Sequence, residues 1–208
     1  MTPVIGDITV SLDGFVTGPG ADLEHGLGLG ADGLHAWALD SDHPVDRGVL
    51  VRHTAASGAV VMGRKTFDTV DGVWSAERGY GADHDGRPPF FVVTSRAPVS
   101  YRLADSHDFI FVLDGPAAAI ERARTAADDR DVFVMGGGAL VGRFIALPVV
   151  QTHELSVELG QCPGVEGIER GVQQLGVVTH RGAGHRGTSR AGLAGPSGRT
   201  HGCSCRIR

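Results

Sequence analysis

Short apolar runs alternate with segments of helical spacing along most of the chain. The apolar runs have four to eight residues and end in glycine, hydroxyl or charged residues, a pattern typical of strands. The expected strands are residues 5–14, 59–63, 89–96, 109–115, 131–138 and 152–159. The first and last of these alternate apolar and polar residues, which predicts strands with one buried face.

Helical segments separate most of these strands. They are residues 45–57, 64–70, 116–129 and 139–147. Residues 116–129 are alanine-rich and begin with proline, which is favoured in the first turn of a helix. Strands joined by helices predict βαβ units, and therefore an α/β domain whose central sheet is largely parallel and flanked by helices.

We expect this domain to span residues 1–175 and to be followed by a disordered tail over residues 176–208. Residues 180–208 contain six arginines, seven glycines and no acidic residue. They have few apolar residues and no periodicity, so they should not form a packed core. A basic tail also suits RNA or an acidic partner, and RNA binding through it would be strongly salt-dependent.

The composition otherwise fits an ordinary globular protein, with 41% hydrophobic and 21% charged residues among 208. The net charge of −5 argues against a general nucleic-acid binder. We see no apolar run long enough to cross a bilayer and no secretory signal, so a cytoplasmic protein without a membrane partner is expected.

The cysteines and histidines do not predict a disulfide framework or a metal site. Three cysteines is an odd number, and two of them lie in the last six residues. Cys203, Cys205 and His201 match no standard closed metal site. No histidine pair has the H-x-x-x-H spacing of a catalytic metal helix.

The polar loop over residues 71–88 is long and rich in glycine. Loops of this length are often binding loops or lids, and the alternative is a mobile surface segment.

Three strand ends carry residues suited to phosphate groups. In VVMGRKTF (60–67), Gly63 ends a strand and Arg64, Lys65 and Thr66 open the next helix. Cations at a helix start oppose the helix dipole, so their presence is explained if an anion binds among them. The alternative is a solvated basic turn.

The second and third strand ends supply different groups. VVTSR (92–96) places two hydroxyls and a guanidinium directly after a strand, a combination that suits a phosphate monoester. VMGGGALVG (134–142) has three consecutive glycines, which allow backbone contact with a pyrophosphate. It is not a Rossmann fingerprint, because Val141 stands in the last glycine position. An ordinary strand end and a plain tight turn are the alternatives.

Together the three turns predict a dinucleotide site. Open α/β sheets bind ligands at the carboxyl ends of their strands, where all three turns are expected. A separate arginine with hydroxyls fits a 2′-phosphate, which favours NADPH over NADH as the cofactor.

The ordered motifs MGRKTF, VVTSR and VMGGGALV resemble those of the dihydrofolate reductase superfamily. The opening ITVSLDGFVTGPG looks more specifically like the branch related to the C-terminal reductase domain of riboflavin-biosynthesis deaminase-reductases. The resemblance covers roughly residues 4–147. It implies a dihydrofolate-reductase-like fold, NADPH as cofactor and a homodimer.

By this resemblance, the first turn would contact the pyrophosphate and adenosine side, the second the 2′-phosphate, and the third would complete the cradle. The cofactor-binding residues implied are Gly63, Arg64, Lys65, Thr66, Thr94, Ser95, Arg96, Gly136, Gly137, Gly138, Ala139 and Leu140.

On the substrate side, the same resemblance places the turn from Ser11 to Gly14 beside the nicotinamide. Asp13 is the candidate catalytic proton donor, and the alternative is an aspartate that stabilises the turn. Ser11, Gly14 and Trp37 are the candidate substrate-binding residues. For Trp37, as for the neighbouring His35, a purely structural role is the alternative.

The resemblance has two gaps. The Pro-Trp segment and the helical carboxylate that binds the pterin in dihydrofolate reductases cannot be placed in LHAWALDSD (34–42). After about residue 147, only HELSVEL (153–159) echoes the family.

From the three turns and the resemblance together, we expect an NADPH-dependent reductase of a small heterocyclic or carbonyl substrate, pyrimidine- or pterin-like, acting by hydride transfer. The alternative is an NADP(H)-binding protein without turnover.

Overall fold

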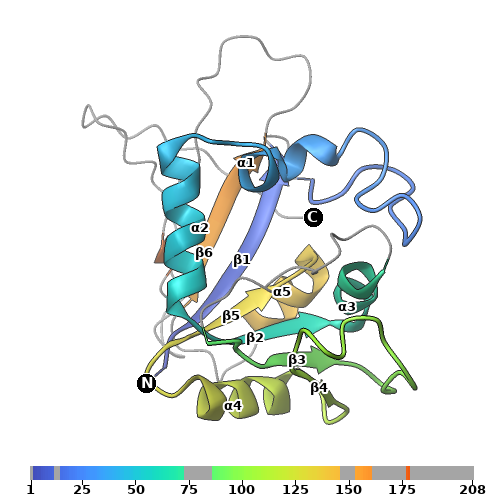
Figure 1. The fold of residues 1–208 in the computed structure, drawn as a ribbon, viewed down its shortest axis with the longest axis vertical. Helices are drawn as coiled ribbons and strands as arrows, with labels where there is room; N and C mark the ends of the chain where they lie inside the picture. The colour runs from blue at the N-terminus through green and yellow to red at the C-terminus, as the bar shows by residue number, and fades with distance from the viewer. Residues whose placement is uncertain (1, 12–14, 73–85, 146–152, 161–176, 179–208) are drawn as a thin grey trace, which may run out of the picture.

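The computed structural model describes residues 2–11, 15–72, 86–145, 153–160 and 177–178. Their strands form one seven-stranded sheet in the order β4-β3-β2-β5-β1-β6-β7 (Figure 1). The strands are β1 Val4–Ser11, β2 Ser57–Gly63, β3 Phe90–Val93, β4 Phe109–Val112, β5 Asp131–Met135, β6 His153–Gly160 and β7 Val177–Val178.

Every neighbouring pair of strands is parallel except β6 and β7. The prediction of a largely parallel central sheet is therefore confirmed. The order of strands places β1, the first in sequence, between β5 and β6 near the end of the chain. Strand β1 at the start of the chain is therefore paired with strands from much later in the sequence.

Helices flank the sheet on both faces. They are the short 3-10 helix η1 Asp32–Leu34, α1 Ala36–Leu39, α2 Pro44–Ala56, α3 Arg64–Asp71, α4 Pro116–Ala127 and α5 Gly138–Ile145. Helices α4 and α5 share one hydrophobic cluster with the sheet, and α3 shares a second cluster on the opposite face. The flanking helices of the predicted fold class are therefore confirmed as well.

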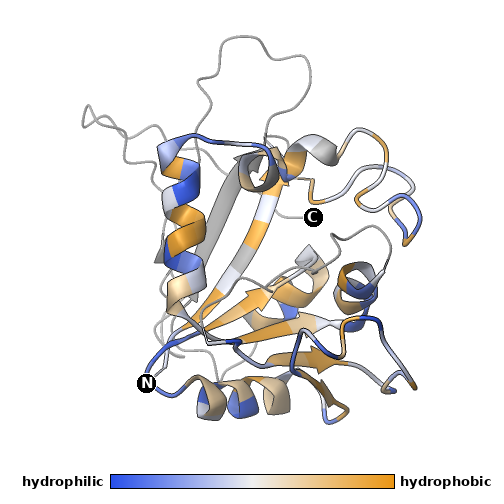
Figure 2. Ribbon diagram, viewed as in Figure 1, coloured by the Kyte–Doolittle hydropathy of each residue, from blue (hydrophilic) through white to orange (hydrophobic). Residues whose placement is uncertain are grey.

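The alternation of side chains along β2 builds both clusters. Val61 belongs to the cluster under α4 and α5, whereas Val60 and Met62 belong to the cluster under α3. All three are at most 1% exposed, so this strand is buried on both faces. Figure 2 shows the same property as hydrophobic colour over most of β2, β3 and β5. Strands covered on both faces read as unbroken apolar runs, which explains the sequence pattern.

The element ends differ from the sequence expectations by a few residues. Strand β2 begins at Ser57, which the helical pattern included in the preceding helix. Strands β3 and β4 end at Val93 and Val112, three residues earlier than expected. Helices η1 and α1 and the two-residue strand β7 were not expected.

Arg102 fastens the end of α3 to the segment that follows β3. Its Nε donates to the carbonyl of Asp71 at 2.9 Å, and its Nη2 donates to the carbonyls of Val70 and Gly72 at 3.3 and 3.2 Å. In return, the Asp71 carboxylate accepts from the backbone N–H of Leu103 at 2.8 Å. These bonds satisfy carbonyls that a helix end leaves without partners.

Candidate functional site

The three turns whose residues suit phosphate groups lie at the carboxyl ends of neighbouring strands. Strands β3, β2 and β5 are consecutive neighbours and all parallel, so their carboxyl ends point the same way. Gly63 at the end of β2 is paired with Val93 at the end of β3. The turns that begin at Gly63, Thr94 and Gly136 therefore stand side by side, as the sequence predicted.

Gly136 brings the glycine turn into direct contact with α3. Its φ of +122° is a conformation that residues with a side chain rarely adopt. A Cβ added there would overlap the hydroxyl of Thr66 and lie 3.3 Å from the Thr66 Cβ atom. Both the backbone conformation and the lack of space require glycine at this position.

The other glycines of this turn have different surroundings. A Cβ at Gly137 would meet nothing within 4 Å, so the backbone here is open on that side. A Cβ at Gly138 would lie 3.8 Å from the Ile8 side chain of β1, and one at Gly63 would lie 3.6 Å from Leu140. The glycine turn thus contacts β1 on one side and the start of α3 on the other.

The start of α3 presents backbone N–H groups without an acidic side chain. Its N-cap is Gly63, which has no side chain to cap the helix, and its first turn holds no Asp or Glu. Unsatisfied N–H groups and the helix dipole favour an anion at such a position. Ala139 and Leu140 open α5 next to it, with the N–H of Leu140 bonded to the Gly137 carbonyl at 3.0 Å.

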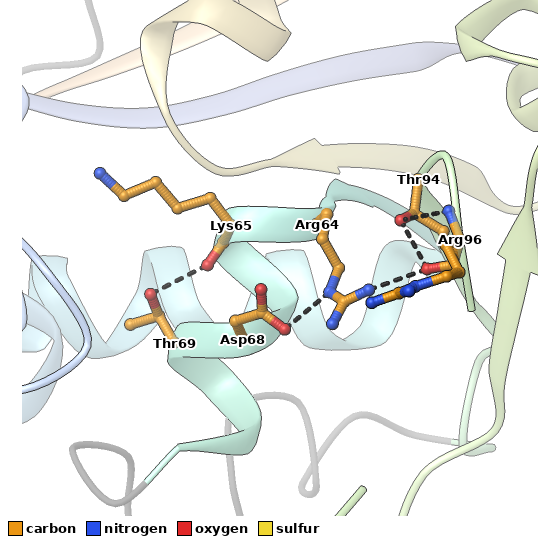
Figure 3. Close-up of polar contacts among 6 residues, drawn as sticks. All are labelled: Arg64, Lys65, Asp68, Thr69, Thr94 and Arg96. Atoms are coloured by element: carbon orange, nitrogen blue, oxygen red, sulfur yellow. Dashed lines mark hydrogen bonds and ion pairs between the residues drawn. The ribbon is translucent and has the colours of Figure 1, made fainter. Parts of the chain in front are cut away.

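Arg64 links the start of α3 to the turn after β3 (Figure 3). Its Nε donates to Asp68 Oδ1 at 2.7 Å, and its Nη1 donates to the backbone carbonyl of Arg96 at 2.8 Å. The Thr94 hydroxyl donates to the same carbonyl at 3.0 Å and accepts from the Arg96 N–H at 3.3 Å. The backbone of Arg96 is therefore held at both its N–H and its carbonyl.

Two cationic side chains of the site have no such engagement. The ammonium group of Lys65 and the guanidinium of Arg96 form no hydrogen bond or ion pair with another described residue. Both residues are exposed, and Figure 3 shows Lys65 extending away from the Arg64–Asp68 pair. Ser95, between Thr94 and Arg96, is exposed as well. These groups are available to an anionic ligand.

Ser11 ends β1 and is bonded to Phe15 through two hydrogen bonds. Its N–H donates to the Phe15 carbonyl at 2.8 Å, and its hydroxyl accepts from the Phe15 N–H at 2.9 Å. Ser11 is 8% exposed, so this clamp is largely buried. Two other predicted residues, Asp13 and Gly14, lie outside the described residues.

Trp37 lies on α1 and contacts the same strand. Its indole N–H donates to the Thr9 hydroxyl at 3.3 Å, which ties the short helix to β1. The indole is partly buried. Ser11 and Trp37 are therefore both associated with the carboxyl half of β1, next to the glycine turn on β5.

Sequence reasoning missed Asp46, a buried carboxylate in the first turn of α2. It is 5% exposed, and one of its oxygens accepts from the Ser41 hydroxyl at 2.5 Å. The other oxygen, Oδ1, has no partner in the described part of the chain. Helix α2 ends immediately before β2 begins, so its first turn lies toward the carboxyl ends of the strands. Pro44 and Asp46 are ordinary helix-start residues, so nothing in the sequence signalled this burial.

The described residues contain no group of three or more His, Cys, Asp and Glu side chains placed to hold a metal ion. Among these same residues, no helix has the length and apolar character needed to span a membrane. Cys203, Cys205, His201 and the tail after residue 178 lie outside the described part of the chain.

No protein-family model and no curated protein matches this chain. Among solved structures, a protein of Shewanella sp. PV-4 provisionally assigned to riboflavin biosynthesis is 18% identical, with a TM-score of 0.49; the match covers 92% of this chain and 88% of that one. Dihydrofolate reductase from Enterococcus faecalis, complexed with NADP(H) and RAB-propyl, is 15% identical, with a TM-score of 0.41, over 87% and 90% of the two chains.

Proposed function

We propose that this protein is an NADPH-dependent reductase of a small heterocyclic or carbonyl compound. The proposal joins the dinucleotide site expected from the three turns to the motif resemblance in the sequence. The resemblance suggests a pyrimidine- or pterin-like substrate. Cytoplasmic location and a homodimeric state belong to the same proposal.

The contact between Gly136 and Thr66 is the observation that carries this proposal. It places the backbone of the glycine turn after β5 directly against the Thr66 side chain at the start of α3. The glycine turn can approach a pyrophosphate closely, because glycine N–H groups are not screened by side chains of their own.

The residues present suit the phosphate groups of NADPH. The open backbone of Gly137 and the N–H groups that begin α3 and α5 suit the pyrophosphate. Lys65 and the guanidinium of Arg96 suit phosphate charge, and Ser95 adds a hydroxyl donor beside Arg96. Thr94 is already engaged with the Arg96 backbone. Its role in this proposal is to fix the turn.

The bound cofactor would supply a hydride, and the protein would supply binding and orientation. We assign the substrate side to the end of β1, where Ser11 and Phe15 are bonded to each other. Asp13, between them in sequence, is the proposed proton donor. The partly buried indole of Trp37 would offer the substrate an apolar surface.

A turnover assay tests the reaction itself. Purified protein is mixed with NADPH and a panel of pyrimidine, pterin and simple carbonyl compounds, and loss of the reduced nicotinamide absorbance is followed. Oxidation with at least one acceptor, abolished by Gly136→Ala, is the expected result. Saturable NADPH binding without oxidation by any acceptor would instead support a nucleotide-binding protein without turnover.

A further inference from the structure

Arg64 is engaged with the protein on two sides. Its Nε–H points at Asp68, one helical turn further along α3, and its Nη1–H points at the carbonyl of Arg96, which is 32 residues away in sequence. The side chains of Arg64 and Asp68 are 38% and 30% exposed. The guanidinium also lies 5.9 Å from the centre of the Phe67 ring. This side chain is therefore fixed by its neighbours before any ligand arrives.

The hydrogen bonds around Arg96 involve its backbone and not its side chain. Its carbonyl accepts from Arg64 and from the Thr94 hydroxyl, and its N–H donates to that hydroxyl. The Arg96 guanidinium has no hydrogen bond or ion pair with another residue that the structure describes. The fixed backbone determines where this free cation starts, and so where it can reach.

We propose that Arg64 is a positioning residue that acts on the cofactor through Arg96, and that the Asp68–Arg64–Arg96 chain sets the preference for NADPH over NADH. The inference rests on the proposed function, because it concerns the 2′-phosphate that distinguishes the two nucleotides. In this arrangement Arg96 contacts the phosphate. Arg64 holds the turn that carries Arg96, and Asp68 holds Arg64.

Asp68 distinguishes this arrangement from a direct contact between Arg64 and the phosphate. If Arg64 bound the phosphate itself, Asp68 would be a nearby negative charge that repels the ligand. Asp68→Asn would then strengthen NADPH binding. If Asp68 orients Arg64, the same substitution weakens its charge-assisted hydrogen bond and loosens the turn. The two arrangements therefore predict opposite signs for one isosteric change.

The experiment measures the dissociation constants of NADPH and NADH for the full chain and for Asp68→Asn. The expected result is a loss of about threefold to tenfold in the NADPH preference, with NADH binding changed by less than about twofold. The matched control is Asp114→Asn, which removes the same charge from an exposed pair with Arg122 at 2.6 Å. This control should leave the preference unchanged. An increased preference in Asp68→Asn overturns the proposal.

A double-mutant cycle tests whether Arg64 acts through Arg96. Arg96→Ala removes the proposed phosphate contact, so Arg64→Ala in that background should not lower the NADPH preference further. Arg64→Ala alone should lower it by about tenfold. Equal losses in both backgrounds would mean that Arg64 contacts the phosphate independently, and would overturn the proposal.

Amide hydrogen exchange in the free protein distinguishes failure of this inference from failure of the proposed function. Arg64→Ala should speed exchange at residues 94–96, whereas Arg122→Ala should not. Faster exchange in a protein that binds neither nucleotide would confirm that Arg64 holds the turn at residues 94–96. It would also refute both the role of the Asp68–Arg64–Arg96 chain in cofactor preference and the proposed function. Unchanged exchange in Arg64→Ala would overturn the inference whatever the protein binds.

Discussion

Gly136 lies against the hydroxyl of Thr66, so that the backbone of the turn after β5 meets a side chain in the first turn of α3. The contact joins neighbouring strands at the edge of the sheet where the proposed cofactor would bind. It depends on one missing side chain, which makes it testable by the smallest possible substitution.

Gly136→Ala should destabilise the protein and abolish nucleotide binding. The added methyl meets Thr66, and the φ of +122° is strained for alanine, at a cost of about 1–3 kcal/mol in the free energy of unfolding. Denaturant unfolding and a nucleotide titration measure the two effects. Gly137→Ala is the matched control, because a Cβ there meets nothing within 4 Å. Its free energy of unfolding should change by less than about 0.5 kcal/mol. Equal stability of the two variants would refute the steric account.

Arg102→Ala should loosen α3 from the rest of the domain. The substitution removes three hydrogen bonds to the carbonyls at the end of this helix. We expect a loss of about 1–3 kcal/mol in the free energy of unfolding, because a hydrogen bond that involves a charged group contributes more to stability than a neutral one. Urea denaturation measures this loss.

The control for Arg102 is Arg122→Ala, which removes an arginine from an exposed ion pair on α4. Such pairs contribute little, so the loss should stay below about 1 kcal/mol. A similar loss in both variants would mean that the Arg102 hydrogen bonds to the end of α3 contribute no more to stability than an exposed ion pair.

Phe67→Ala should produce the largest loss of stability among these variants. The Phe67 ring is 1% exposed and makes edge contacts with Tyr101, Phe109 and Phe111 at centroid distances of 5.8, 5.0 and 5.2 Å. Removing a buried phenylalanine side chain costs about 3–5 kcal/mol. Thermal unfolding monitored by circular dichroism reports the shift in Tm.

Val99→Ala provides the comparison for Phe67, because Val99 is fully exposed. Its Tm should stay close to that of the unchanged protein. A small effect of Phe67→Ala would show that α3 does not depend on this aromatic cluster.

Trp37→Phe should detach α1 from β1 while keeping most of the apolar surface. The substitution removes the indole N–H that donates to Thr9 at 3.3 Å. A single neutral hydrogen bond contributes about 0.5–1.5 kcal/mol, so the loss of stability should be of that order. If Trp37 also lines the substrate site, KM for an acceptor should rise while NADPH affinity is retained. Unchanged KM would leave Trp37 a structural residue.

The parts of the site that the sequence predicted are local in origin. Each phosphate-friendly turn follows its strand within a few residues, so the apolar run and the polar residues after it can be read together. Residues 63–66, 94–96 and 136–140 were identified in this way, and the parallel sheet brings them to one edge. Gly136 was expected to allow backbone contact with a pyrophosphate, whereas its contact with Thr66 required the structure.

The parts that sequence reasoning missed depend on long-range contacts. The bond between Arg64 and the Arg96 carbonyl joins α3 to the turn after β3, 32 residues away in sequence. Arg64 was therefore expected only as a cofactor ligand. Helix α1 has only four residues, which is too short to show helical periodicity in the sequence. It is held to β1 by the hydrogen bond from Trp37 to Thr9. The burial of Asp46 likewise depends on packing that its helix-start pattern does not reveal.

The most direct test of the central claim is a calorimetric titration with NADPH, NADH and NADP⁺, performed on the unchanged protein and on Arg96→Ala. The account predicts micromolar NADPH binding, weaker NADH binding, and a preference that falls by about tenfold or more without the Arg96 guanidinium. No binding of any of the three nucleotides would contradict the account, and so would a preference that Arg96→Ala leaves intact.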